Sequence, residues 1–156
     1  MLETVNEDRT VSGSGMTRRS ENISPPAQQP ARDDIAPEVT LGDDGILRVD
    51  YSRHDCVTLA SLHYVHARHV ALCPSGKIPA LFMGHNIGRV DYAAQRYISS
   101  PEVCAGISAG AIVVQSFFER HLGRMFLVYH RPPFPVRIFS DVAAALSWLR
   151  GFLPPG

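Results

Sequence analysis

The stretch "YHRPPFPVRIF", residues 129–139, decides the fold because it turns an apolar helix into a strand within a few residues. Pro132 and Pro133 each lack the backbone N–H that a helix needs, and proline disfavours helical geometry in the residue before it. Pro135 stands where the strand begins, a position that tolerates proline when the missing donor faces a sheet edge. We therefore expect a helix that ends just before the prolines and a strand at residues 134–139.

The same alternation of strand and helix runs back through the chain. Residues 45–51 alternate apolar and polar side chains, and residues 78–84 and 109–115 are uninterrupted apolar runs, so all three predict strands. Helices are predicted between the strands by three- and four-residue apolar spacing, with starts at Asp55, Asp91 and Ser116. A short helix is expected at "SSPE" and a last one in "SDVAAALSWLRGF". Four strand–helix units indicate an α/β fold with a largely parallel, layered sheet and covering helices.

Residues 1–40 differ from the rest of the chain and predict a disordered tail before one α/β domain, residues 41–156. The tail is rich in Ser, Gly, Pro, Gln and charge and offers almost nothing to bury. Met16 is a second candidate start codon, so the sequence leaves open whether residues 1–15 are translated. The segment "TRRS" matches a docking or phosphorylation motif, although such short matches often arise by chance.

Composition and charge limit the kinds of partner and the cellular compartment that we expect for this protein. The formal net charge is zero, with −3 on residues 1–40 and +3 on the remainder, so there is no bulk attraction to nucleic acid or acidic membranes. No segment approaches the roughly 18 apolar residues of a spanning helix, and the polar start lacks a signal peptide. Three widely spaced cysteines do not make a disulfide framework. We expect a cytoplasmic protein that neither binds nucleic acid nor inserts into a membrane. Its 14 Arg against one Lys are typical of a GC-rich genome such as that of an actinobacterium.

The run "YISSPEVCAGISAGAIVVQSFFERHLGRMFLVYHRPPFPVRIFSDVAAALSWL" resembles small bacterial STAS-like proteins. These share a fold with anti-sigma-factor antagonists and with the cytoplasmic domain of sulfate transporters. The strand "AIVV", the glycine-containing apolar helix, the linker "RPPFPVRIF" and the final "DVAAALSWL" carry the resemblance, which extends over residues 41–152. It implies a non-catalytic module that binds a protein partner, without a cofactor, and in some relatives binds a nucleotide or another small ligand.

One feature of the family is missing from this chain. The anti-sigma-factor antagonists are switched by phosphorylation of a Ser or Thr that follows a strand and opens a helix. The matching place here is "GRVDYAAQ", where Asp91 and Tyr92 stand and no hydroxyl of that type is present. We therefore do not expect the phosphorylation switch at this position.

The loop at residues 85–92 is the first candidate site, for a small anionic ligand. Loops at the carboxyl ends of parallel strands bind ligands, helix N-termini offer free N–H groups to anions, and Arg89 adds a charged fork. The candidate residues are His85, Asn86, Arg89, Asp91 and Tyr92. Alternatively, His85, Asp91 and Tyr92 are the acid–base groups of a small biosynthetic enzyme, or the loop is simply polar with a capping Asp.

The helix after Ser116 provides a candidate partner surface. Arg120 and Arg124 are four residues apart and share a helix face. The predicted partner surface consists of Arg120, Arg124, Phe126, His130 and Arg131, unless these charges form an ordinary solvated stripe. The helix is more apolar than a one-sided helix requires, so a second subunit of a homodimer is another candidate for this surface.

Three histidines give a lower-ranked hypothesis. His63, His66 and His69 lie at three-residue spacing on one side of a predicted helix, where they could ligate Zn²⁺ together with His54 or Cys56. Otherwise they are half-buried histidines that titrate near neutrality. Phosphate-binding and nucleophile motifs are absent from the sequence. The sequence therefore predicts a non-enzymatic regulatory or binding module first, a small enzyme as the alternative, and a zinc-binding module below both.

Overall fold

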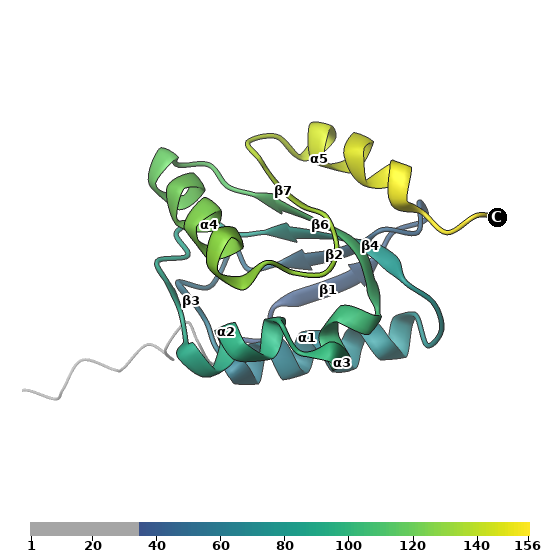
Figure 1. Cartoon of the computed structure of the whole chain (residues 1–156), viewed down its shortest axis with the longest axis horizontal. Helices are drawn as coiled ribbons and strands as arrows, with labels where there is room; N and C mark the ends of the chain where they lie inside the picture. The colour runs from purple at the N-terminus through teal and green to yellow at the C-terminus, as the bar shows by residue number, and fades with distance from the viewer. Residues whose placement is uncertain (1–34) are drawn as a thin grey trace, which may run out of the picture.

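A five-stranded sheet forms the centre of the computed structural model, which describes residues 35–156 (Figure 1). Its strands, in spatial order, are β1 (Glu38–Leu41), β2 (Leu47–Asp50), β4 (Ile78–Met83), β6 (Ile107–Val113) and β7 (Val136–Phe139). Two short strands, β3 (Cys56–Val57) and β5 (Arg89–Val90), pair with each other in a second sheet. Met16, the "TRRS" segment and the rest of residues 1–34 lie outside the described residues.

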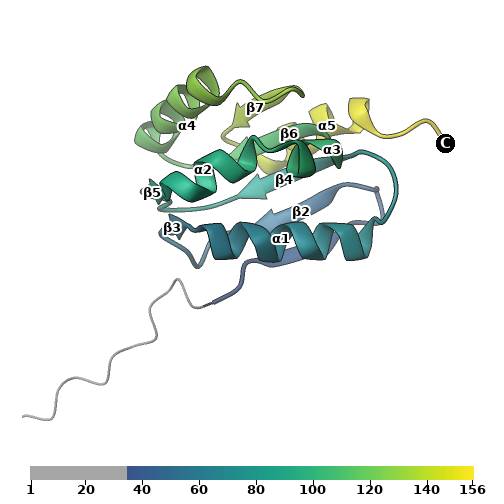
Figure 2. The same ribbon diagram turned by 60° about the horizontal axis from the view of Figure 1, so that its bottom comes forward.

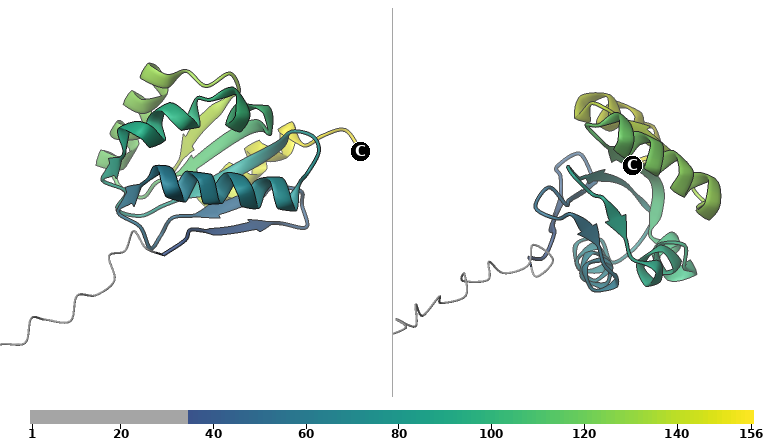
Figure 3. Two further views of the ribbon diagram at one scale, coloured as in Figure 1. Left: turned by 90° about the horizontal axis from the view of Figure 1, so that it is seen from below. Right: turned by 90° about the vertical axis from the view of Figure 1, so that its left-hand side faces the viewer.

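The helices divide unequally between the two faces of the sheet. They are α1 (Leu59–Leu72), α2 (Tyr92–Ile98), α3 (Pro101–Ala105), α4 (Phe117–His130) and α5 (Val142–Leu149), followed by the 3-10 turn η2 (Arg150–Phe152). β1 runs antiparallel to β2, whereas β2, β4, β6 and β7 are parallel neighbours. Right-handed crossovers between successive parallel strands place α1, α2, α3 and α4 on one face, and α5 follows the last strand onto the other (Figure 3). The predicted four βα units in a layered sheet are confirmed.

The starts of α1 and α2 correct two expectations. Asp55 does not cap α1, because the two residues after it form β3. Thr58 caps the helix instead: its hydroxyl accepts from the N–H of Ser61 at 3.1 Å, and the Ser61 hydroxyl accepts from the N–H of Thr58 at 3.2 Å. Asp91 does stand at the N-cap of α2, but its side chain makes no capping hydrogen bond.

The two ends of α4 agree with the sequence. Ser116 caps the helix, its hydroxyl accepting from the N–H of Glu119 at 3.0 Å, and the Glu119 carboxylate accepts in return from the N–H of Ser116 at 3.0 Å. The helix ends at His130, and Arg131 takes the left-handed conformation with φ of 32°. β7 begins directly after Pro135, so the prolines separate helix from strand as predicted.

Strand β1 shows that ordered structure begins before residue 41. Glu38 pairs with Asp50 and Leu41 with Leu47, and Val39 is buried against the α1 side of the sheet. The sequence prediction of a tail over residues 1–40 is therefore wrong for residues 38–40, where the strand is short and three of its four residues are exposed. A strand with so little apolar pattern is not distinguishable from a polar linker by periodicity.

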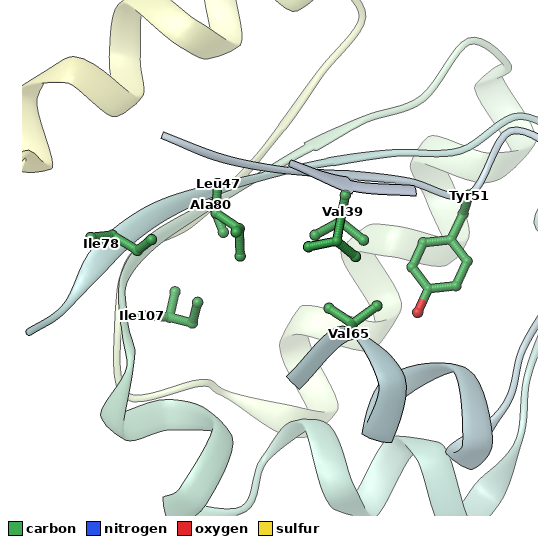
Figure 4. Close-up of a cluster of buried hydrophobic side chains, with 8 residues drawn as sticks. Val39, Leu47, Tyr51, Val65, Ile78, Ala80 and Ile107 are labelled. Carbon is green, nitrogen blue, oxygen red and sulfur yellow. The ribbon is translucent and has the colours of Figure 1, made fainter. Parts of the chain in front are cut away.

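Two hydrophobic clusters lie on opposite faces of the sheet. The cluster on the α1 face, drawn in Figure 4, contains Val39, Leu47, Val49, Tyr51, Val65, Ile78, Ala80 and Ile107. The cluster on the α5 face contains Ile46, Leu81, Ala109, Ala111, Val113, Ala145 and Leu149. α5 contributes two fully buried residues to its cluster, whereas none of the described side chains of α4, a longer helix, belongs to either cluster or is fully buried. The α4 part of the fold is therefore much less tightly packed than the α5 part.

Leucine-to-alanine substitutions should reveal this difference. Leu149→Ala removes a side chain with 0% exposure, and we expect a loss of about 2–5 kcal/mol in the free energy of unfolding. Leu122→Ala on α4 removes a half-buried side chain, and we expect a loss below about 1 kcal/mol. Urea denaturation of the two variants measures both losses. Equal losses would show that α4 is packed as tightly as α5.

Candidate functional site

An apolar cavity of about 520 Å³ lies on the face of the sheet that carries α1–α4. Figure 2 shows α4 and the pair α2–α3 as separate elements. Residues of both line the cavity. Its floor is made by Phe82 of β4, Ile112 of β6 and Val136 of β7. The walls come from Tyr97, Ile98 and Val103 on the α2–α3 side and from Leu122, Phe126 and Leu127 on the α4 side, and Pro132 and Phe134 contribute from the linker after α4.

The attachment of α4 explains why the space beneath it is not filled. The Glu119 carboxylate accepts from the backbone N–H of Asn86 at 2.5 Å and of Gln115 at 3.2 Å, besides that of Ser116. One turn further on, Gly123 lies so close to β7 that a Cβ added there would stand 2.9 Å from Ile138 Cδ1. These contacts hold α4 near the β7 edge of the sheet. The floor also lacks a side chain at Gly110 of β6, so the space between α4 and α2–α3 stays open.

The cavity is partly open to solvent, so water or a ligand can enter it. Ligand-binding pockets fall in the range of roughly 300–1,000 Å³ and have mostly apolar linings. The volume and the lining both fit a binding pocket rather than a packing defect.

Two of the predicted histidines line this cavity. His69 of α1 is only 5% exposed, and its Nε2 is buried and has no hydrogen-bond partner among residues 35–156. Burial lowers the pKa of His69, and the neighbouring His66 lowers it further. Tyr51 lines the cavity too, but its hydroxyl lies 3.3 Å from the Ser61 hydroxyl, and burial raises the pKa of Tyr51 to about 12. His69 is thus a buried polar side chain at the cavity with an unused hydrogen-bonding atom.

The zinc hypothesis is not supported. The three histidines share one side of α1 but meet different neighbours: His63 packs edge-on against Tyr97, and His66 Nε2 lies 3.3 Å from a carboxylate oxygen of Glu102. The His69 ring lies against Gly106, where an added Cβ would be 2.5 Å from Cε1. In the described part of the chain, no three His, Cys, Asp or Glu side chains converge in a way that could hold a metal ion.

The loop at residues 85–92 does not gather its predicted residues into one site. His85 lines a second, smaller pocket together with Asp50, Ser52, Ser140 and Asp141, whereas Arg89 lies at the edge of the apolar cavity. Tyr92 is 75% exposed and lines neither of these pockets. The three acid–base residues predicted for an enzyme, His85, Asp91 and Tyr92, are therefore not brought together in either pocket.

The remaining loop residues have structural contacts. Asn86 adopts a left-handed conformation with φ of 65°, which directs its N–H to Glu119. Arg89 Nε donates to the sulfur of Cys56 at 3.3 Å and lies 3.7 Å from the Asp91 carboxylate. The Cys56 thiol lies 3.6 Å from the same carboxylate. These contacts link β3 to β5 and to the start of α2.

The predicted partner surface on α4 divides between the two sides of the helix. Phe126 and His130 line the cavity, and their rings are 4.4 Å apart. Arg124 and Arg131 are exposed on the other side. Together with Phe117, His121 and Val128, which the predicted surface did not include, they form an outer stripe, defined as Phe117, His121, Arg124, Val128 and Arg131.

The spacing of the outer-stripe residues in the sequence could have revealed this surface. Its members follow one another at spacings of four, three, four and three residues. This spacing places the first four on one face of α4, and Arg131 follows just past the end of the helix. All five are exposed; Phe117 is 85% exposed and Val128 66%. Large apolar side chains at such exposure, in a row with basic residues, mark a surface that can meet another molecule.

The model of a family described as a domain of unknown function, DUF7793, matches residues 40–153. The chain belongs to this family. An uncharacterized DUF3478-family protein from Shewanella loihica PV-4, solved with a SpoIIAA-like fold, is 16% identical, with a TM-score of 0.52 over 73% of this chain and 92% of that chain. A protein with unknown function from Arthrobacter sp. FB24 is 29% identical over 71% of this chain and 90% of that chain, with a TM-score of 0.25. No curated protein matches the chain.

The DUF7793 domain thus has a SpoIIAA-like fold, the fold of the STAS-like proteins that the sequence resembles, and this expectation is confirmed. The match to the Shewanella protein concerns the fold alone. Within residues 35–156, no helix of the DUF7793 domain has the length and apolar character needed to cross a membrane.

The buried His69 predicts a pH dependence of stability. Because its pKa is lower in the folded domain than in the unfolded chain, the unfolded chain binds the proton first as the pH falls below about 6.5. The free energy of unfolding should therefore fall between pH 7.5 and pH 5.5, and it should fall less in His69→Leu. Urea midpoints at the two pH values measure this change.

The matched control is His63→Leu, an exposed histidine six residues earlier on the same helix. It should keep the pH dependence of the wild type. If His69→Leu and the wild type lose equal stability over this pH range, then His69 is not the group responsible.

Proposed function

We propose that this domain is a non-enzymatic regulatory module of the cytoplasm that acts by binding a protein partner through the outer stripe of α4. The observation that carries the proposal is the row of five exposed residues along α4 and its C-cap, because no described side chain of this helix belongs to either hydrophobic cluster. A helix so poorly buried adds little to the stability of the fold. Its exposed aromatic, aliphatic and basic side chains are better explained by an interaction.

The charge of α4 supports a partner with an acidic surface. The stripe contains Arg124, Arg131 and His121, and the one acid in the helix, Glu119, is engaged by backbone N–H groups at its start. Arg and aromatic residues are enriched in protein interfaces, and complementary charge guides encounter. An acidic patch that also offers apolar contacts for Phe117 and Val128 fits this surface.

The same charge argues against a homodimer through this stripe. A two-fold contact would place the stripe against its own copy, so that the Arg side chains of both helices would face one another. Like charges brought together at an interface weaken it. A different protein is therefore the better occupant.

The fold and the loop geometry support a binding role over catalysis. STAS-like proteins, which the sequence resembles, act mainly as binding modules. The acid–base alternative required His85, Asp91 and Tyr92 in one pocket, and no single pocket described above contains them. We therefore propose neither the enzyme nor an anion site at residues 85–92.

Charge reversal on the stripe tests the proposal. The full chain is immobilised as wild type and as Arg124→Glu, and the proteins captured from its own host are quantified by mass spectrometry. We expect at least one protein with an acidic surface to be captured by the wild type and to be reduced about tenfold or more by Arg124→Glu.

The control is Arg68→Glu, which reverses an exposed charge on α1 and should leave capture unchanged. The same proteins captured equally by all three, or no specific protein captured by the wild type, would refute a partner site on the outer stripe.

A further inference from the structure

We propose that the outer stripe of α4 is covered by residues 2–8 of the same chain, an acidic segment that the protein partner must displace. This inference rests on the proposed function, because it adds the regulation of the surface assigned there. All five stripe residues are exposed within the described part of the chain, residues 35–156. Charge, composition and chain length each support residues 2–8 as the segment that covers them.

Residues 2–8 carry a negative charge that no base balances. The segment contains no Arg or Lys and three acids, Glu3, Glu7 and Asp8. The outer stripe contains two arginines, one histidine and no acid. Complementary charge favours the contact between two surfaces, and salt weakens it when the charges are exposed.

The segment also supplies apolar side chains that the stripe can bury. Leu2 and Val5 stand among its acids, while Phe117 of the stripe is 85% exposed and Val128 is 66% exposed. Removing apolar surface from water is favourable. The other acids before residue 35 stand within two residues of an arginine and have at most one large apolar neighbour, in "RRSENIS" and "ARDD". Residues 2–8 therefore match the stripe best.

The described chain begins at the same end of the sheet as α4. β1 starts with Glu38, which pairs with Asp50 at the end of β2. α4 follows the end of β6, and Glu119 in its first turn accepts from the N–H of Asn86, which follows β4. β2, β4 and β6 are parallel, so their ends lie at one edge of the sheet. The chain before β1 thus enters at the edge where the outer stripe begins.

The connecting chain, residues 9–34, is long enough to reach the stripe from there. β1 and β6 are three strand spacings apart, roughly 14 Å, and the width of a helix adds roughly 10 Å. An unstructured chain of the length of residues 9–34 has a root-mean-square span of roughly 30 Å. A linker whose span matches the separation of two sites gives an effective concentration in the millimolar range. A contact too weak to form between separate molecules therefore forms within one chain.

Paramagnetic relaxation in the full chain tests the contact without any partner. A nitroxide is attached at Thr10→Cys, next to the segment, in a Cys73→Ser background, because the other two cysteines are buried. We expect it to broaden the amide signal of Val128 at low salt and to broaden it less at high salt. The control is Ser147, exposed on α5 on the opposite face of the sheet, whose signal should not change. Equal broadening of the two signals, or none, would overturn the proposal.

Charge substitutions identify the two sides of the contact. Arg124→Glu should reduce the broadening of Val128 about threefold or more, and Arg68→Glu on α1 should leave it unchanged. Glu7→Arg added to Arg124→Glu should restore at least half of it. Broadening that persists in Arg124→Glu, or that Glu7→Arg does not restore, would remove residues 2–8 from the stripe. Amide spectra of each variant confirm that the compared proteins are folded.

Two further measurements establish that the segment is present and acts within its own chain. The intact mass of the protein from its own host shows where translation starts, and a start at Met16 would remove the segment and overturn the proposal. Isotope-labelled chains without nitroxide are then mixed with nitroxide-bearing chains without isotope. Broadening of Val128 in this mixture would assign the segment to a second copy and overturn a contact within one chain.

Partner capture separates this inference from the proposed function. Neutralising the segment with Glu3→Gln, Glu7→Gln and Asp8→Asn frees the stripe and should raise capture about threefold or more. Capture that stays equal would overturn the competition. If a partner is captured but Val128 is not broadened, this inference fails and the proposed function stands. If Val128 is broadened and even the neutralised chain captures no protein, the proposed function fails and the contact within the chain stands.

Discussion

The carboxylate of Glu119 holds the first turn of α4 against the loop that follows β4, and the candidate site depends on this contact. Burial alone would raise the pKa of this carboxyl group, but backbone N–H groups of Ser116, Asn86 and Gln115 hold it below its usual range. The charged group thus serves two structures at once: it completes the cap of its own helix and anchors a loop 33 residues away. With its start fixed there and Gly123 close to Ile138, α4 lies at the β7 edge and leaves the sheet beside it uncovered.

The order of the strands explains why the two faces of the sheet differ so much. Successive parallel strands add side by side, so each right-handed crossover puts its helix on the same face, and that face must accommodate α1, α2, α3 and α4. The opposite face is left to α5, which packs Ala145 and Leu149 against the small residues Ala109 and Ala111 of β6. Small side chains on that side let the helix approach the sheet closely. On the crowded face, the helices cannot all reach the sheet equally well, and α4 is the helix that does not.

The sequence was sufficient for the architecture because the signals that decide it are local. The prolines after residue 131, the cap at Ser116 and the apolar runs of β4 and β6 each act within a few residues. The missed elements lack such a signal: β1 has one buried residue in four, and β3 and β5 are two residues long and exist only because they pair with each other. Asp55 was misassigned as a cap for the same reason, since the pairing of Cys56 with Arg89 is not visible in the sequence near it.

The site was harder to predict because it is a space rather than a set of residues. The histidine spacing on α1 was read correctly, but which neighbour each ring meets depends on α2, α3 and Gly106, which come from other parts of the chain. The cavity itself is defined by the distance between α4 and the α2–α3 pair, and no residue pattern encodes a distance between two elements. The loop at residues 85–92 was predicted as a site because its residue types can bind ligands or transfer protons. In the structure, several of its polar atoms instead form the contacts that connect β3, β5 and α4. The outer stripe, by contrast, could have been found by projecting the sequence of α4 onto a helical wheel.

The two faces of α4 bear on how a regulatory module of this kind can work. The cavity and the outer stripe are formed by the same 14-residue helix, whose described side chains are all at least partly exposed. Elements with few buried contacts occupy the low-stability end of a protein and shift at little cost. If occupancy of the cavity moves α4, then the affinity of the outer stripe for its partner changes, and linkage requires the partner to change the affinity of the cavity by the same factor. If α4 does not move, the two sites bind independently, and a ligand in the cavity serves only to complete the packing of the helix. A partner titration with and without an apolar ligand in the cavity distinguishes these two cases, because coupling appears as a shift in the binding midpoint and independence leaves the midpoint in place.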